Sequence, residues 1–298
     1  MMIESADIVI LGHVAKDIIE VDGESYTSIG GAVYYGGIAG SHMGLKIIII
    51  TRLKEEDYEI LTAFKKNGVK YYAYPSEETS GLKNIYSSTN MEFRSYKPLG
   101  FAGLFKQEEI IKINSKFFVI GPITAGEVNL ELLKHLKTQH PENLCLDMQG
   151  FIRFRDNKKV SYSHITLKEK EEIISNINVL KVDQTEAEIL TDQKNIKTAA
   201  KNLLKFGPRE ILITHEDGIS IFANNFSYTF PWKNKSSLGR TGRGDTAFIS
   251  YLGSRISKDP EQSLKFAAAL TSLKLETPGP FSLPRHQVET LINEEYTD

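Results

Sequence analysis

Six short apolar segments recur along this chain of 298 residues, and the helical patterns between most of them limit the possible folds more than any other feature. A parallel sheet produces such an alternation, because its strands are joined by crossovers that lie on its faces. The pattern therefore predicts an α/β fold with a mostly parallel central sheet that helices cover on both sides. The segments are residues 8–11, 47–50, 117–120, 144–146, 179–182 and 211–213.

Two stretches interrupt this alternation. Residues 14–30 and 71–100 are polar, prone to β-structure and rich in turn residues, and neither offers a good helical face. We expect them to form a small antiparallel sheet inserted into the α/β core, with an ordinary surface hairpin as the alternative.

The charged residues are balanced and interspersed. Thirty-six Lys and Arg stand against 38 Asp and Glu, a formal net charge of −2, which argues against a nucleic-acid partner or an anionic membrane. No apolar run approaches the roughly 20 residues of a membrane span, and the N-terminus lacks the features of a secretion signal. We therefore expect a cytoplasmic protein that acts on small molecules. The single cysteine, Cys145, lies in an apolar segment and is expected to be a buried structural thiol.

A glycine-rich segment that ends in an aspartate is the strongest indication of chemistry. Residues 239–246 read Gly-Arg-Thr-Gly-Arg-Gly-Asp-Thr and precede a helical pattern whose apolar face includes Phe248, Ile249 and Leu252. Glycines let the backbone approach a ligand, and the N–H groups of a first helical turn attract phosphate. Asp245 would then stand beside an anion site, where a carboxylate can accept a hydroxyl proton. An aspartate that only caps the helix is the alternative.

This segment resembles the glycine-aspartate signature of the ribokinase-like, or PfkB, carbohydrate kinase family. The resemblance spans nearly the whole chain and implies one domain, residues 1–298, folded as a three-layer α/β/α sandwich. It also implies that the stretches at about 14–30 and 71–100 form a lid, whose closure would exclude water from the reaction.

The same resemblance assigns roles within the glycine-rich segment. It implies that Gly242, Arg243 and Gly244 form the anion hole and that Asp245 removes the proton of the acceptor hydroxyl. Two positions depart from the family pattern. Gly239 stands where an aspartate is usual, and Arg243 replaces the usual small residue between the glycines.

Motifs near the N-terminus resemble the acceptor-binding residues of the family. Asp17 follows the first strand, where the family binds acceptor hydroxyls, and an ionised carboxylate can accept two hydrogen bonds there. Gly30 and Gly31 would let the chain approach the sugar, and Tyr35 replaces the asparagine that usually contacts it. Tyr35 either donates its hydroxyl or forms an apolar wall, and packing in the core is the alternative.

Gln149 and Arg153 lie in a segment that resembles the Asp-x-Asn-x-Arg motif of the family. This segment follows a predicted strand, and open α/β sheets bind ligands at the carboxyl ends of their strands. Arg153 and Arg240 are candidates to hold a phosphate or an acidic acceptor. A salt bridge that orients the loop is the alternative for Arg153, and a solvent-facing or surface-paired side chain is the alternative for Arg240.

The donor site is implied by two further motifs. Residues 183–186 resemble the Asn-x-x-Glu motif, so Glu186 inherits a role at Mg²⁺, although a first-turn helix acid is the alternative. Thr214, His215 and Gly218 match a turn beside the nucleotide, and Gly279 matches a loop that borders adenine.

Together these motifs imply an ATP-dependent, Mg²⁺-dependent kinase that phosphorylates a hydroxyl of a small polyol, sugar or sugar acid. The motifs are most similar to the inositol-kinase-like branch, which favours a cyclic polyol or a keto sugar acid. A nucleoside kinase and a non-catalytic sugar or nucleotide sensor remain alternatives. A homodimer through the lid is also expected from related proteins.

Overall fold

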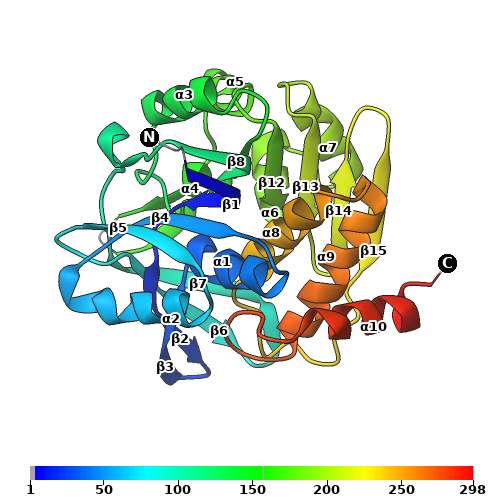
Figure 1. Ribbon diagram of the computed structural model, residues 1–298, viewed down its shortest axis with the longest axis horizontal. Coiled ribbons are helices and arrows are strands. Elements are labelled where there is room, and N and C mark those ends of the chain that lie inside the picture. Colours follow the sequence, from blue (N-terminus) through cyan, green and yellow to red (C-terminus); the bar gives the residue numbers. More distant parts are fainter. Residues whose placement is uncertain (1–3, 157, 298) are drawn as a thin grey trace.

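The computed structural model describes residues 4–156 and 158–297, with the backbone alone for residues 90–94. Across this part of the chain the central sheet has nine strands in the order β15-β14-β13-β12-β9-β8-β1-β4-β5 (Figure 1). Neighbouring strands are parallel except at one edge, where β14 pairs in antiparallel with both β13 and β15. The strands are β1 (Glu4–Leu11), β4 (Ile47–Leu53), β5 (Lys70–Pro75), β8 (Ile113–Ile120), β9 (Leu144–Asp147), β12 (Val179–Asp183), β13 (Glu210–Thr214), β14 (Gly218–Phe222) and β15 (Ser227–Pro231).

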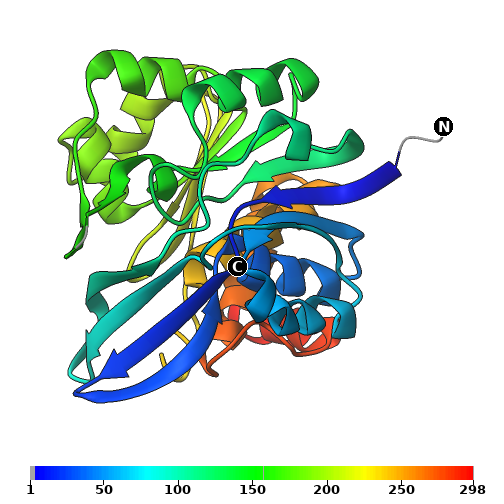
Figure 2. The same cartoon turned by 90° about the vertical axis from the view of Figure 1, so that its left-hand side faces the viewer.

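Helices cover both faces of this sheet, so the predicted three-layer α/β/α sandwich is confirmed (Figure 2). Successive side chains of a strand point to opposite faces. In β1, Ile8 and Ile10 accordingly enter one apolar core, and Val9 and Leu11 enter the other. One layer holds α1 (Ala32–His42), α2 (Thr62–Lys66), α8 (Arg243–Arg255), α9 (Pro260–Leu275) and α10 (Arg285–Glu295), and the other holds α3 (Leu130–Gln139), α5 (Leu167–Ile174), α6 (Gln184–Thr191) and α7 (Ile196–Leu204).

A second, four-stranded sheet extends away from the three layers, at the lower left of Figure 2. It contains the antiparallel hairpins β2 (Ala15–Val21) with β3 (Glu24–Gly30) and β6 (Gly81–Ser87) with β7 (Asn90–Gly100). The two hairpins are joined by the parallel pair β2 and β6.

One boundary of this small sheet differs from the prediction. The second stretch was expected to begin at residue 71, but Lys70–Pro75 forms β5, which pairs in parallel with β4 at the edge of the central sheet. The aromatic, β-prone composition of this segment indicates a strand, but composition does not specify which sheet an edge strand joins.

Four parallel strands, β1, β9, β12 and β13, end at the same edge of the central sheet, and this edge carries the polar residues considered next. A short helix, α4 (Gln149–Ile152), and a hairpin of β10 (Arg153–Arg155) with β11 (Val160–Tyr162) follow β9 there. In the described ranges, no helix combines the length and the apolar character needed to cross a membrane.

Candidate active site

The turn before α8 has the geometry that its glycines indicate. Gly242 is the N-cap of α8 and has a φ of 82°, in the left-handed region that favours glycine. The Gly244 N–H has no hydrogen-bond partner among the described residues, so it can donate to an anion. The Arg243 N–H differs from the expectation, because it already donates to the Arg240 carbonyl oxygen at 3.3 Å. The turn closes on itself at that point, which removes one of the expected anion-hole donors.

A small, strongly polar hollow lies in front of this turn. The carboxyl ends of β9, β12 and β13 and the N-terminus of α8 contribute its walls, which is where an open α/β sheet places a ligand. Eight of the residues predicted from the sequence meet here. They are Gln149, Arg153, Thr214, Arg240, Gly242, Arg243, Gly244 and Asp245.

The hollow also contains Lys181, a functional candidate that the motifs did not indicate. Its ammonium donates to Asp147 Oδ2 at 2.9 Å and lies 3.9 Å from Glu186 Oε2. Burial opposes this charge, but the carboxylates of Asp147 and Glu186 outweigh it and raise the pKa of Lys181. The ammonium also lies directly beside Gly244, where an added Cβ would be 2.9 Å from Nζ. The available signal was a lysine inside an otherwise apolar strand segment.

Glu186 is fully buried at the start of α6. Its Oε2 accepts the Asp183 N–H at 2.7 Å, and Asp183 Oδ1 accepts the Glu186 N–H at 2.8 Å, so the pair forms a capping box. The capping box supports the interpretation of Glu186 as a first-turn helix acid. The predicted role at Mg²⁺ also has support, because Glu186 Oε1 is buried without a hydrogen-bond partner in the part of the chain described. Burial and the neighbouring Asp183 raise the pKa of Glu186 to about 8.

The geometry around Glu186 fits a metal bound through water better than one bound directly. Over residues 4–156 and 158–297, no group of three His, Cys, Asp or Glu side chains is arranged to hold a metal ion. Mg²⁺ dehydrates reluctantly and keeps several waters in such sites. Glu186 Oε1 is suited to accept a hydrogen bond from one of those waters.

Two arginines of the hollow are held by aromatic rings. Arg153 is buried, donates from Nη2 to the Tyr162 hydroxyl at 3.0 Å, and lies 4.9 Å from the centroid of Tyr96 in the small sheet. Arg243 is also buried, and its guanidinium lies 5.8 Å from the ring of Trp232. Both contacts direct the guanidinium without neutralising its charge.

The predicted acceptor residues from the N-terminal part lie beside the hollow and do not line it. Asp17 is buried in β2, and its Oδ1 accepts the Leu82 N–H at 2.8 Å. Gly30 lies against this carboxylate, since a Cβ there would be 2.3 Å from Asp17 Oδ2, and Gly31 follows with a φ of 93°. Tyr35 is only 2% exposed, so its ring packs in the core, and its contact with the acceptor remains a prediction.

The predicted donor residues are more widely spread. Thr214 is buried at the end of β13 and lines the hollow. His215, Gly218 and Gly279 do not line it. His215 Nε2 lies 3.3 Å from Ser220 Oγ, and burial lowers the pKa of His215. Gly218 packs against the Phe230 carbonyl in the β14–β15 pair, while Gly279 has open space around it. Their role at the donor remains a prediction.

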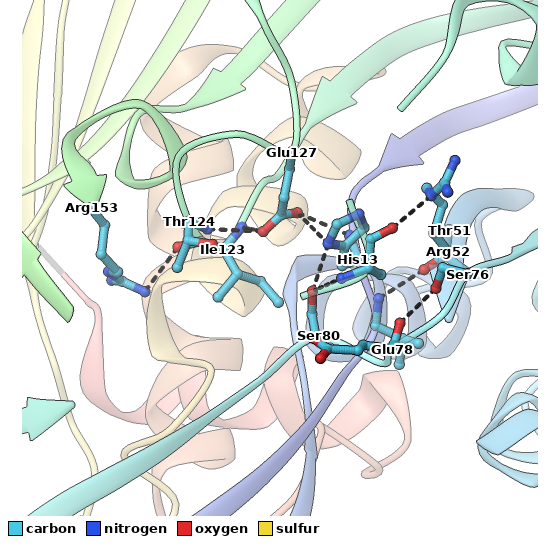
Figure 3. A network of polar contacts seen from close by, with 12 residues as sticks. His13, Thr51, Arg52, Ser76, Glu78, Ser80, Ile123, Thr124, Glu127 and Arg153 are labelled. Atoms are coloured by element: carbon cyan, nitrogen blue, oxygen red, sulfur yellow. Dashed lines mark hydrogen bonds and ion pairs between the residues drawn. The ribbon is translucent and has the colours of Figure 1, made fainter. Parts of the chain in front are cut away.

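The small sheet is connected to the core through a buried polar network around His13 (Figure 3). His13 Nδ1 lies 2.7 Å from Ser80 Oγ, which also accepts the Ala102 N–H at 3.1 Å. Glu127 Oε2 accepts the His13 N–H at 3.3 Å. Residues 13, 80 and 102 belong to three of the four connections between the two sheets, so this network fixes the base of the small sheet.

The small sheet also contacts the glycine turn before α8 directly. The Tyr86 hydroxyl in β6 lies 3.1 Å from Thr241 Oγ1, just before Gly242. Together with Tyr96 beside Arg153, this contact places the small sheet against the rim of the hollow.

Comparisons with known proteins agree with this geometry. The profile of the pfkB family carbohydrate kinases matches residues 38–285. Cytidine kinase from Thermococcus kodakarensis is 21% identical over 266 residues, which are 80% of this chain and 84% of that protein.

Solved structures extend the comparison to the whole fold. A pyrophosphate-dependent kinase in the ribokinase family, complexed with a pyrophosphate analog and myo-inositol, is 32% identical with a TM-score of 0.87, covering 95% of this chain and 99% of that chain. Arabidopsis thaliana ribokinase, complexed with ribose and ATP, has a TM-score of 0.75 at 18% identity, covering 97% and 99% of the two chains. The latter shows the common fold alone.

The family match covers most of the chain, and the resemblance seen in the motifs is confirmed. Kinases of this family transfer a phosphoryl group to a hydroxyl, which is the chemistry that a carboxylate beside an anion-binding turn can perform. This chain belongs to the pfkB family of carbohydrate kinases, and it is a ribokinase-like phosphotransferase that acts on a hydroxyl of a sugar, polyol or nucleoside.

Proposed function

We propose that this enzyme phosphorylates a hydroxyl of a cyclic polyol of the inositol type, with Asp245 as the general base and pyrophosphate as the donor. The observation that carries the proposal is the hollow itself, in which Asp245 faces a set of buried or half-buried cations around the Gly242–Gly244 turn. The solved relative at 32% identity binds a pyrophosphate analog and myo-inositol, which supports both substrates.

The proposed reaction divides its work between the carboxylate and the cations. The acceptor oxygen attacks the terminal phosphorus of the donor, its proton passes to Asp245, and the P–O bond to the leaving phosphate breaks. Lys181 and the Gly244 N–H stabilise the negative charge on the transferred group. Mg²⁺, held through water at Glu186, would screen the charge of the donor.

Asp17 and the small sheet supply the acceptor side in this proposal. Asp17 is placed by the Leu82 N–H at the base of β6, and its second oxygen lies beside Gly30, where a hydroxyl can approach. The small sheet acts as the lid, since Tyr86 and Tyr96 bring it to the rim of the hollow. Closure would exclude water, which competes with the polyol for the phosphoryl group.

The position of Arg243 favours pyrophosphate as the donor. The motifs alone predict ATP. Its guanidinium extends from the anion turn toward Trp232, whose Nε1 donates to the His215 carbonyl oxygen at 2.9 Å. A nucleotide would lie beside residues 214–218 according to the family resemblance, and the Arg243 guanidinium is linked to this turn through Trp232 and His215. A guanidinium there is well suited to bind the second phosphate of an inorganic diphosphate.

A matrix of donors and acceptors tests the proposal. Purified protein with Mg²⁺ is given pyrophosphate, ATP or CTP, each with myo-inositol, ribose, 2-keto-3-deoxygluconate or cytidine, and products are followed by ³¹P NMR. We expect an inositol phosphate from pyrophosphate, and a decrease in kcat of about 10²-fold or more in Asp245→Asn with donor binding retained. Turnover only of cytidine with a nucleotide would instead establish the nucleoside kinase.

A further inference from the structure

Lys274 lies near the end of α9 with 1% of its surface exposed, and the family motifs give it no role. Its ammonium donates to two backbone carbonyl oxygens of the catalytic turn, that of Gly239 and, at 2.5 Å, that of Thr241. It also lies 5.1 Å from the centroid of the Tyr35 ring. Two of these contacts are with the segment that presents Gly242 and Asp245, and the third is with a ring of α1 that packs against Gly242.

This environment is unusual for a buried lysine. Burying an ammonium is unfavourable unless other groups compensate its charge, and most buried lysines pair with a carboxylate. In the described ranges, no carboxylate oxygen lies within 4.0 Å of Lys274 Nζ. Carbonyl oxygens and a ring face compensate the charge instead, and proteins hold monovalent cations with the same kinds of groups.

The turn also packs closely against the end of α9 at Gly239. The Gly239 N–H donates to the Leu275 carbonyl oxygen at 2.8 Å. A Cβ at Gly239 would lie 2.0 Å from the Thr277 carbonyl oxygen and 2.5 Å from that of Lys274. An aspartate, which is usual at this position in the family, has no room here, and the charged group that contacts the turn carbonyls is the Lys274 ammonium.

We infer that Lys274 acts as a built-in monovalent cation, a positioning residue that holds the Gly239–Gly242 turn in the shape required for phosphoryl transfer. It touches neither donor nor acceptor, and it acts through the carbonyls of Gly239 and Thr241. The enzyme therefore needs no added K⁺ or NH₄⁺. This inference rests on the phosphotransfer proposed above, but it also predicts a property of the protein that can be measured without turnover.

The pKa of Lys274 reflects its burial and its charged neighbours. Burial and the nearby Arg240 lower the pKa of Lys274 to about 7, while the charge of Asp245 raises it. The charge of Asp245 therefore favours the ammonium form of Lys274, while burial opposes it.

Removal of the ammonium should create a requirement for an external cation. Lys274→Ala leaves a space lined by the two carbonyls, and we expect kcat to fall by about 10²-fold in a tetramethylammonium buffer, with little change in the acceptor KM. NH₄⁺, K⁺ or methylammonium at high concentration should restore kcat by about tenfold or more. Lys274→Met fills the same space without charge and should not be rescued.

Thermal unfolding gives a second readout that does not depend on the reaction. NH₄⁺ or K⁺, compared with tetramethylammonium at equal ionic strength, should raise the Tm of Lys274→Ala and leave that of the wild type unchanged. Lys201→Ala, which removes an exposed lysine of α7, is the matched control and should behave as the wild type.

Several results would overturn the inference. One such result is a tenfold activation of the wild type by K⁺ or NH₄⁺, and this test needs no variant. Lys274→Ala could remain fully active, or it could fold, lose activity and respond to none of the cations in either kcat or Tm. If the wild type transfers no phosphate at all, the proposed function fails, while the cation effect on the Tm of Lys274→Ala still decides whether Lys274 replaces a bound cation.

Discussion

The ring of Tyr35 lies directly against the backbone of Gly242, so that a Cβ at Gly242 would meet ring carbon Cδ1 at 2.2 Å. Tyr35 belongs to α1 and Gly242 caps α8, and these helices pack closely through Gly36 and Ile249. The tyrosine that replaces the usual asparagine of the family therefore supports the catalytic turn from behind. Its hydroxyl is buried, and burial raises the pKa of Tyr35.

Gly242→Ala should impair catalysis more than a matched glycine substitution elsewhere. Gly44 has a φ of 83°, nearly the same as the 82° of Gly242, but has no atom within 4 Å of an added Cβ. Gly44→Ala should lower the free energy of unfolding by about 1 kcal/mol through backbone strain and leave kcat unchanged. Gly242→Ala must also displace Tyr35, and we expect kcat to fall by about tenfold or more. Steady-state kinetics and urea unfolding of both variants test this, and equal kcat values would contradict it.

Arg243→Ala should change the choice of donor. Loss of the guanidinium beside Trp232 removes the proposed contact with the second phosphate of pyrophosphate. We expect the KM for pyrophosphate to rise by about tenfold or more, the KM for the polyol to stay within twofold or so, and the preference for pyrophosphate over ATP to decrease. Arg209→Ala removes an exposed arginine that pairs with Glu142 and is the control. Unchanged pyrophosphate kinetics in Arg243→Ala would refute the assigned donor contact.

Lys181→Met should destabilise the fold as well as the transition state. The substitution leaves the buried carboxylates of Asp147 and Glu186 without their shared cation. Breaking a buried ion pair in this way typically lowers the free energy of unfolding by about 3–5 kcal/mol. The loss should be smaller at pH 5 than at pH 8, because protonation of Glu186, whose pKa burial raises, relieves its unpaired charge in the folded variant. Urea unfolding at both pH values measures this difference, and an equal loss at each pH would argue against it.

His13 and Glu127 should exchange a proton when the protein unfolds. Burial lowers the pKa of His13 to about 3 and raises that of Glu127 to about 7. Arg52 and Arg155 also disfavour the charged imidazole, and Arg153 partly favours the Glu127 carboxylate. Between pH 4.5 and 6.5, the folded protein therefore holds one proton on Glu127, and the unfolded chain holds one on His13.

The signs follow from these shifts. The contribution of Glu127, whose pKa is raised on folding, is present at low pH and is lost as the pH rises, whereas the contribution of His13 is lost as the pH falls. In the wild type, the opposite pH dependences that His13 and Glu127 give to the free energy of unfolding cancel. His13→Asn should become more stable as the pH falls from 6.5 to 4.5, and Glu127→Gln less stable, each by up to about 1.4 kcal/mol per pH unit. Urea unfolding across this range measures both slopes, and parallel slopes in the two variants would disprove the exchange.

The strands and the catalytic helix could be predicted from the sequence because their signals are local. The alternation of Ile8, Val9, Ile10 and Leu11 between two cores comes from the period of a strand, and any parallel sheet would show it. The glycine turn before α8 is likewise encoded in consecutive residues. Strand ends of a parallel sheet meet at one edge, so the cluster of Gln149, Thr214 and Asp245 also followed from their positions in the chain.

Contacts between distant segments depended on packing, and no local pattern could reveal them. β5 joins the central sheet because β4 offers it a free edge, although its composition suits either sheet. Lys181 and Lys274 have their roles only because folding brings Gly244 to one and the Gly239 carbonyl to the other. Local periodicity reports which residues are buried, whereas the partner that compensates a buried charge is chosen by the three-dimensional arrangement of the chain.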